Sequence, residues 1–274
     1  MNYDQASNTP AVVLLHGYPF NRSMWRDQVE TLSAGGFRAI APDLRGFGEV
    51  SGKLQLVADV DRGASERQAE AYWTLTTMAD MARDVAALMD DLEIESAVIC
   101  GLSMGGYVAF EFAHLFPARV KALVLAGTRA PADNEQEKQG RLQQVEQMLT
   151  NGMTGIAEAS LPKLLALRTR AEKPEVVARL REMIGRTNPF AAAAAQRGMA
   201  ARRDYSDDLA NIQAPALVIV GRDDPIRPVG DAEFMHKGIR NSRLEIIEDA
   251  AHMTNMEQPE VFNGALREFL KLIH

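Results

Sequence analysis

The sequence has one cysteine, Cys100, among its 274 residues. A single cysteine cannot form a disulfide within the chain, and neither a CxxC nor an HxxxH pair is present to suggest a metal site. Nothing therefore points to an oxidising compartment, and we expect a cytoplasmic protein that uses no metal and no cofactor.

The chain also lacks an excess of basic residues. It contains 30 Lys and Arg against 37 Asp and Glu, which gives a formal net charge of −7. Proteins that bind nucleic acid neutralise phosphates with clustered positive charge, so this balance argues against a nucleic-acid partner. Hydrophobic residues make up 46% and charged residues 24%, which is the composition of a globular protein.

Long hydrophobic runs are missing as well. A membrane-spanning helix needs about 18 or more consecutive apolar residues, and the longest apolar runs here have only the length of a strand. Residues 1–10 are polar and lack the charged start and apolar centre of a signal peptide. We expect neither a membrane span nor export.

The short apolar runs predict a parallel sheet. They are rich in Val, Leu and Ile without polar residues in alternation, which is typical of strands buried on both faces. The runs are residues 11–15, 97–100, 122–126 and 216–220, with a weaker one around Leu244 and Ile246.

Stretches of helical periodicity lie between these runs. Thr77 and Asp80 have the spacing of a capping box before an amphipathic stripe, and a second helix should follow Ser103 and end before Pro117. A last helix should begin at Pro259. The alternation of strands and helices predicts an α/β fold with a mostly parallel, doubly wound sheet built from right-handed βαβ units.

The strand signal disappears over residues 131–211. Segments rich in Ala, Glu, Gln, Arg and Leu replace it, and their periodicity is helical. They span 135–149, 174–184 and 191–201. We interpret residues 131–211 as a helical cap inserted into a core formed by residues 1–130 and 212–274. The long connection at 49–73 is either the rim of a site or a mobile surface segment.

Gly101-Leu102-Ser103-Met104-Gly105 has the pattern of a nucleophile elbow. It follows an expected strand and precedes an expected helix, and in that context G-x-S-x-G places a serine on a sharp, strained turn. Small residues beside the serine let the strand and the helix approach each other. A glycine-rich turn at a helix start is the alternative, but the context favours Ser103 as a nucleophile.

A serine nucleophile needs a base, and the base needs an acid that orients it. In the chain order Ser, acid, His, the acid follows a late strand and the histidine follows the last one. His252 has the position of the base, with His16 as the only rival. Asp223 and Asp224 both have the position of the acid, and we favour Asp224 because adjacent side chains point to different sides. The carboxyl ends of parallel strands bring all three groups to one crevice.

Acyl transfer also needs two backbone N–H donors for the oxyanion of its tetrahedral intermediate. Met104 can supply one, since it follows Ser103 at the start of a helix, where N–H groups are free. Tyr18 can supply the other from the turn His16-Gly17-Tyr18-Pro19, in which we expect Gly17 to permit an unusual backbone angle. An ordinary tight turn is the alternative.

These motifs resemble the α/β-hydrolase superfamily over nearly the whole chain. They are H-G-Y-P at 16–19, D-L-R-G-F-G at 43–48, G-L-S-M-G-G at 101–106, G-R-D-D at 221–224 and A-H-M-T-N-M-E-Q-P at 251–259. The resemblance is greatest to small carboxylesterases and 3-oxoadipate enol-lactonase-like hydrolases. It implies that Tyr18 and Met104 donate to the oxyanion and that Asp224 is the acid. It also implies an antiparallel hairpin before the first strand, which we expect to be absent or reduced because only ten residues precede Ala11.

The residues and the resemblance together predict a serine hydrolase that cleaves a small carboxylic ester or lactone through an acyl-Ser103 intermediate. A cofactor-free perhydrolase, or hydrolysis of a carbon–carbon bond next to a ketone, would use the same groups. A non-catalytic ligand-binding module of this fold is a further alternative, and the complete Ser-His-Asp set argues against it.

Two more residues could contact the substrate. Arg129 follows the run at 122–126 and could bind a substrate carboxylate, although an ion pair that anchors the insertion to the core is the favoured interpretation. Trp25 could form an apolar wall of the site, but its helical spacing from Val29 and Leu32 also predicts a place in the core.

Overall fold

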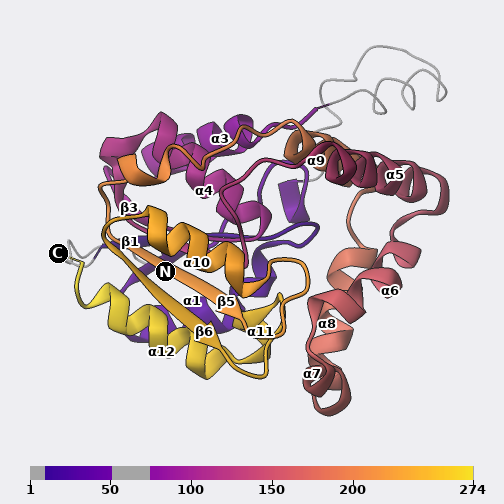
Figure 1. The fold of residues 1–274 in the computed structure, drawn as a ribbon. Coiled ribbons are helices and arrows are strands. Elements are labelled where there is room, and N and C mark those ends of the chain that lie inside the picture. The colour runs from indigo at the N-terminus through magenta and orange to yellow at the C-terminus, as the bar shows by residue number, and fades with distance from the viewer. Residues whose placement is uncertain (1–9, 51–74, 274) are drawn as a thin grey trace.

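A computed structural model describes residues 10–50 and 75–273 (Figure 1). In these ranges six strands form one sheet in the order β2-β1-β3-β4-β5-β6, and all neighbouring strands run parallel. The strands are β1 (Ala11–Leu15), β2 (Arg38–Ile40), β3 (Ala97–Leu102), β4 (Val120–Ala126), β5 (Ala216–Gly221) and β6 (Ser242–Ile247). The predicted parallel sheet is confirmed. The expectations for the segment before Ala11 and for the connection at 49–73 fall mainly outside the described residues.

The central strands are mostly buried, and only the first two residues of β4 are half-buried. Every residue of β1, β3 and β5 is buried, which explains why these strands read as continuous apolar runs in the sequence. The two edge strands differ from them. All three residues of β2 are half-buried, and most of β6 is only partly buried.

Helices cover both faces of the sheet (Figure 1). On one face the buried residues of α1 (Arg26–Ala34) and α12 (Pro259–Leu270) share a core with Val12 and Leu14 of β1. On the other, the buried residues of α3 (Met78–Asp91), α4 (Met104–Leu115) and α10 (Val229–Gly238) share a core with Val13 and Leu15. Successive strand residues point to opposite faces, so one short strand serves both cores. The short elements are η1 (Arg22–Trp25), η3 (Pro117–Arg119), η4 (Leu209–Asn211) and α11 (Thr254–Glu257).

The helix boundaries follow local sequence signals. The Thr77 hydroxyl accepts a hydrogen bond from the Asp80 N–H at 3.0 Å, and the Asp80 carboxylate accepts one from the Thr77 N–H at 3.0 Å. The predicted capping box is therefore confirmed. The predicted start of the last helix at Pro259 is also confirmed. None of the helices in the described ranges is long and apolar enough to span a bilayer.

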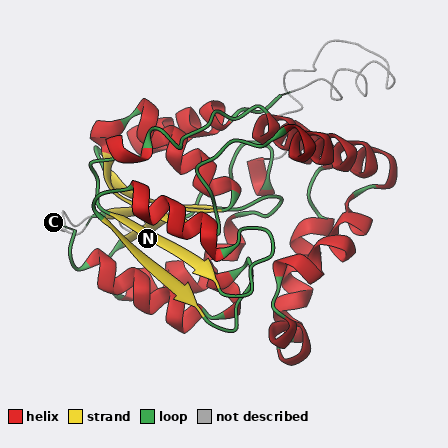
Figure 2. Ribbon diagram, viewed as in Figure 1, coloured by secondary structure: helices red, strands yellow, loops and turns green. Residues whose placement is uncertain are grey.

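Five α-helices lie between β4 and β5, and Figure 2 shows only helix and loop along this part of the described chain. They are α5 (Glu135–Asn151), α6 (Met153–Leu164), α7 (Leu167–Glu172), α8 (Pro174–Gly185) and α9 (Pro189–Ala200). We call them the inserted helices. They lie beyond the carboxyl ends of the strands (Figure 1). Many of their buried apolar residues, such as Met148 and Leu180, continue one of the two cores of the sheet, whereas Ala195 and Met199 of α9 belong to the other.

His16 fastens the turn after β1 to a neighbouring segment. Its ring is fully buried, and Nε2 accepts a hydrogen bond from the Leu44 N–H at 2.9 Å. Nδ1 therefore carries the proton and donates to the Gly17 carbonyl at 2.9 Å. Burial lowers the pKa of His16 to about 4. His16 is thus a neutral structural residue and not the base of the site.

This burial predicts a pH-dependent stability. The folded-state pKa of His16 lies below the unfolded value of 6.5, so its contribution is present above pH 6.5 and is lost as the pH falls towards 4. We expect the free energy of unfolding to fall by on the order of 2 to 3 kcal/mol between about pH 7.5 and about pH 4.5 from this group alone. Urea unfolding of the wild type and of His16→Asn measures it: the variant should be less stable at the higher pH but lose less on acidification. Equal losses in the two proteins would contradict this role.

Candidate active site

One cavity of about 610 Å³ lies between the sheet core and the inserted helices. The core lines it with Tyr18, Ser103, Tyr107, Ile226, Arg227 and His252, and the inserted helices with Arg141, Gln144, Ser160, Lys163 and Leu164. The core residues come from segments that follow β1, β3, β5 and β6. The cavity therefore lies at the carboxyl edge of the sheet, where α/β proteins bind ligands.

Ser103 lies on a sharp turn between β3 and α4. Its φ is 55° and its ψ is −112°, a strained conformation for a residue with a side chain. The turn is tight because a Cβ on Gly101 would come within 2.1 Å of the Gly105 carbonyl oxygen, and one on Gly105 within 2.1 Å of the Leu15 carbonyl oxygen. The Ser103 N–H donates to the Ala126 carbonyl at 2.9 Å. This is the geometry expected of a nucleophile elbow.

His252 follows β6 and Asp224 follows β5, and the two buried side chains meet at the cavity. Asp224 Oδ2 lies 2.8 Å from His252 Nδ1, while Asp224 Oδ1 accepts the N–H groups of Ile226 and Arg227 at 2.8 and 2.9 Å. Both carboxylate oxygens are therefore fixed. The neighbouring Asp223 is exposed, so Asp224 is the aspartate that faces the histidine. A proton on Nδ1 shared with Asp224 leaves Nε2 as the basic nitrogen.

Of the two expected oxyanion donors, one follows Ser103 in the chain and the other lines the same cavity. Met104 is the first residue of α4, so its N–H has no acceptor within the helix. Tyr18 follows β1 and lines the same cavity as Ser103. Gly17 has no positive φ, so the expectation of an unusual backbone angle there is wrong. The space at Gly17 is tight instead, because a Cβ would lie 3.3 Å from the Leu102 carbonyl oxygen and the neighbouring atoms would have to move by a few tenths of an ångström.

The two residues predicted as possible substrate contacts do not line the cavity. Trp25 is fully buried, with its ring centroid 6.0 Å from that of Phe262 in α12. Arg129 Nη2 contacts Asp133 at 2.9 Å and Glu137 at 2.7 Å. Trp25 therefore belongs to the core. Arg129 joins the end of β4 to α5, which is the anchoring role that the sequence favoured.

Tyr107 and Arg227 line the cavity and were not predicted. The Tyr107 hydroxyl accepts a hydrogen bond from Arg227 Nε at 3.1 Å, and the Arg202 guanidinium lies 4.1 Å from the centre of the Tyr107 ring. Burial raises the pKa of Tyr107, but the positive charges of Arg227 and Arg202 outweigh it and lower the pKa overall. Both residues have a sequence signal: Tyr107 is one helical turn after Ser103, and Arg227 is three residues after Asp224.

The charged residues around the cavity are unequally paired. Asp133 contacts Arg202 at 2.7 Å and also pairs with Arg141. By contrast, neither the Arg227 guanidinium nor the Lys163 ammonium group has a carboxylate within 4.0 Å among the described residues. The same part of the chain contains no group of three or more His, Cys, Asp or Glu placed to hold a metal ion.

Known proteins resemble this chain along most of its length. A family model for the alpha/beta hydrolase fold matches residues 10–259. The chain is 30% identical to 3-oxoadipate enol-lactonase 2 of Acinetobacter baylyi over 97% of this chain and 90% of that protein. Among solved structures, a thermophilic esterase from Thermogutta terrifontis with malate bound has a TM-score of 0.85 and 39% identity, covering 97% of this chain and 92% of that one. The enol-lactonase from Burkholderia xenovorans has a TM-score of 0.83 and 27% identity, covering 98% and 94%.

The geometry predicts different effects at two adjacent aspartates. Asp224→Asn replaces the acceptor of the Nδ1 proton with an amide, so the reaction of Ser103 with a fluorophosphonate should slow by about three to four orders of magnitude. Asp223→Asn alters an exposed neighbour with the same change of charge and should stay within about twofold of the wild type. Labelling rates followed by intact-protein mass measure both, and similar losses in the two variants would contradict the assignment of Asp224.

Proposed function

The chain belongs to the α/β-hydrolase family, and from that premise we propose that it is a serine hydrolase that cleaves a small carboxylic ester or lactone through an acyl-Ser103 intermediate. One observation carries this proposal: the buried 2.8 Å contact of His252 with Asp224 beside a cavity that Ser103 also lines from a strained turn. These residue types in this arrangement suit nucleophilic acyl transfer.

In the proposed reaction, Ser103 Oγ attacks the carbonyl carbon while His252 Nε2 accepts its proton. Asp224 holds the Nδ1 proton and stabilises the resulting imidazolium. The N–H groups of Tyr18 and Met104 donate to the oxyanion. His252 then returns the proton to the leaving alkoxide, and water attacks the acyl-enzyme by the same route to release the acid and free Ser103. With a lactone, the alkoxide stays attached to the acyl chain, so a single ring-opened acid results.

The size of the cavity and the nature of the relatives support this substrate class. A volume of about 610 Å³ suits a small molecule. Relatives at 30% and 39% identity are an enol-lactonase and an esterase, which favours ester or lactone cleavage over perhydrolysis or carbon–carbon cleavage by the same groups.

We further propose that the preferred substrates carry a carboxylate. Arg227 and Lys163 line the cavity, and in the described part of the chain neither the guanidinium nor the ammonium group forms an ion pair with a carboxylate. Arg227 contacts the hydroxyl of Tyr107, and Tyr107 lies in α4 one helical turn after Ser103. A guanidinium in a partly buried site binds a carboxylate through charge-assisted hydrogen bonds. Arg227 therefore has the role that the sequence offered to Arg129.

The first test uses Ser103→Ala. We expect the wild type to hydrolyse short-chain aryl esters and small lactones at neutral pH with a chelator present, because side chains and backbone N–H groups of the chain supply every protein group of the mechanism. The variant should lose turnover while keeping its circular dichroism spectrum and melting temperature. Ester hydrolysis that persists in folded Ser103→Ala would refute the proposal.

A second test addresses the carboxylate. The first substrate is an aryl half-ester of a dicarboxylic acid, and the second is the same aryl ester with its free carboxyl group converted to a methyl ester. The wild type should hydrolyse the aryl ester bond of the first about tenfold more efficiently, in kcat/KM, than that of the second. Arg227→Gln should remove most of this preference through a higher KM for the half-ester, and the diester should change little. Equal losses for the two substrates would mean that Arg227 supports the loop instead of the substrate.

A further inference from the structure

Glu257 is a fully buried carboxylate next to the loop that carries His252. Its Oε1 accepts a hydrogen bond from the Ala251 N–H at 2.8 Å, and its Oε2 accepts one from the Ala166 N–H at 2.7 Å. Ala251 immediately precedes His252, whereas Ala166 lies between α6 and α7. One side chain therefore joins the histidine loop to the inserted helices.

The residue after His252 is tied to the same place. The Met253 N–H donates to the Leu164 carbonyl at 3.1 Å, and Leu164 is the last residue of α6 and lines the cavity. The backbone on both sides of His252 is thus held by the junction of α6 and α7, through Glu257 on one side and directly on the other. The ring itself is held by Asp224.

The chemistry of this position requires a carboxylate. Burial raises the pKa of Glu257, although hydrogen bonds from groups that include the Ala166 N–H counteract the shift. A buried charge is unfavourable unless hydrogen bonds compensate it. Two N–H groups that meet two separate oxygens give this compensation. Glutamine has the same size but only one acceptor oxygen, so its amide would turn N–H groups towards one of the two donors.

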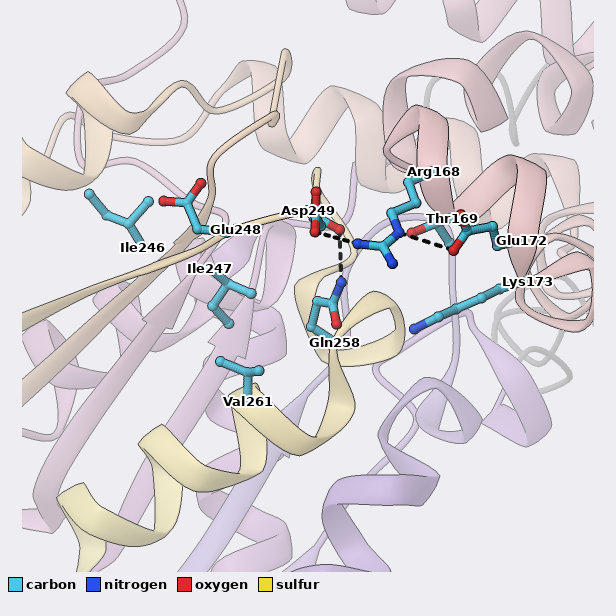
Figure 3. Close-up of a pocket in the computed structure, with 10 residues that line it drawn as sticks. All are labelled: Arg168, Thr169, Glu172, Lys173, Ile246, Ile247, Glu248, Asp249, Gln258 and Val261. Carbon is cyan, nitrogen blue, oxygen red and sulfur yellow. Dashed lines mark hydrogen bonds and ion pairs between the residues drawn. The ribbon is translucent and has the colours of Figure 1, made fainter.

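Other contacts surround this buried one, and those of Arg168 are exposed. Figure 3 shows Arg168 between Asp249 and Glu172, with Arg168 Nη1 at 2.7 Å from Asp249 Oδ2 and Nε at 3.0 Å from Glu172 Oε2. Lys173 Nζ donates to the Glu257 carbonyl at 2.5 Å. Arg168, Glu172, Lys173 and Asp249 line a second cavity, of about 390 Å³, between α7, the end of β6 and α12. The Arg168 and Asp249 side chains are 60% and 54% exposed, and ion pairs with such exposure contribute little.

We propose that Glu257 is a positioning residue: it fastens the His252 loop to the inserted helices and so keeps His252 aligned with Ser103 and Asp224. The inference rests on the proposed serine-hydrolase function. Glu257 does not face the substrate, and it acts on the reaction only through the backbone that carries His252. Its loss should therefore slow the reaction of Ser103 without weakening substrate binding.

The test compares Glu257→Gln with Arg168→Gln, which removes an exposed contact at the same junction. In Glu257→Gln we expect kcat for an aryl ester and the fluorophosphonate labelling rate of Ser103 to fall together by about tenfold or more, with KM within about twofold. Arg168→Gln should stay within about twofold of the wild type in all three quantities. Glu257→Asp keeps both oxygens but withdraws them by one methylene, so it should lie between the wild type and Glu257→Gln.

The number of active sites is found by titrating each protein to completion with the fluorophosphonate, and each rate is divided by that number. All measurements are made well below the melting temperature of each variant. If a Glu257 variant only lost folded protein, the number of titrated sites would fall and the rate per site would stay at the wild-type value. That result would overturn the inference, and so would wild-type rates per site in both Glu257 variants. A wild type that is labelled but cleaves no ester refutes the proposed substrate class, while the labelling rates still decide the role of Glu257. A wild type that is not labelled overturns both.

Discussion

The contact of Gly105 with the Leu15 carbonyl oxygen is the constraint on which the site depends. With no side chain at this position, the first turn of α4 lies directly against the end of β1. This position of α4 requires the sharp turn at Ser103 that connects β3 to the helix. The same approach sets Gly105 against the turn after β1, because a Cβ on it would come within 2.9 Å of the His16 carbonyl oxygen, and Tyr18 follows in that turn. One steric condition in the backbone thus brings the start of α4, with Ser103 and Met104, to the turn that carries Tyr18, which is far from them in the sequence.

A second set of groups converges from the other half of the sheet, and hydrogen bonds to buried carboxylates hold it. Asp224 fixes the ring of His252, and its second oxygen caps the loop that carries Arg227. Glu257 fixes the backbone beside His252. The inserted helices take part in both the apolar core and this polar framework, so they are as much a support for the site as a wall of its cavity.

Sequence patterns predicted those parts of the molecule that a local rule governs. The buried strands appear as apolar runs, and the Ser103 turn has a glycine pattern that sterics impose. Strand β2 was missed because three half-buried residues at a sheet edge form no such run. Whether a loop residue returns to the cavity depends on tertiary packing, and for this reason Arg227 was missed and Trp25 was offered as a substrate contact although it lies in the core.

The tie between the α6–α7 junction and the histidine loop has a consequence for transplanting segments between relatives. A chimera that exchanges all the inserted helices must present a backbone N–H at Ala166 and a carbonyl at Leu164 in the same register, or the acceptors and donors around Glu257 are left unpaired in the interior. The middle of α5 is paired elsewhere, because Gln144 accepts a hydrogen bond from Gln196 of α9 at 2.9 Å and Arg141 donates to the same Gln196 at 2.8 Å. The cavity-lining side chains of α5 therefore have to be exchanged together with α9.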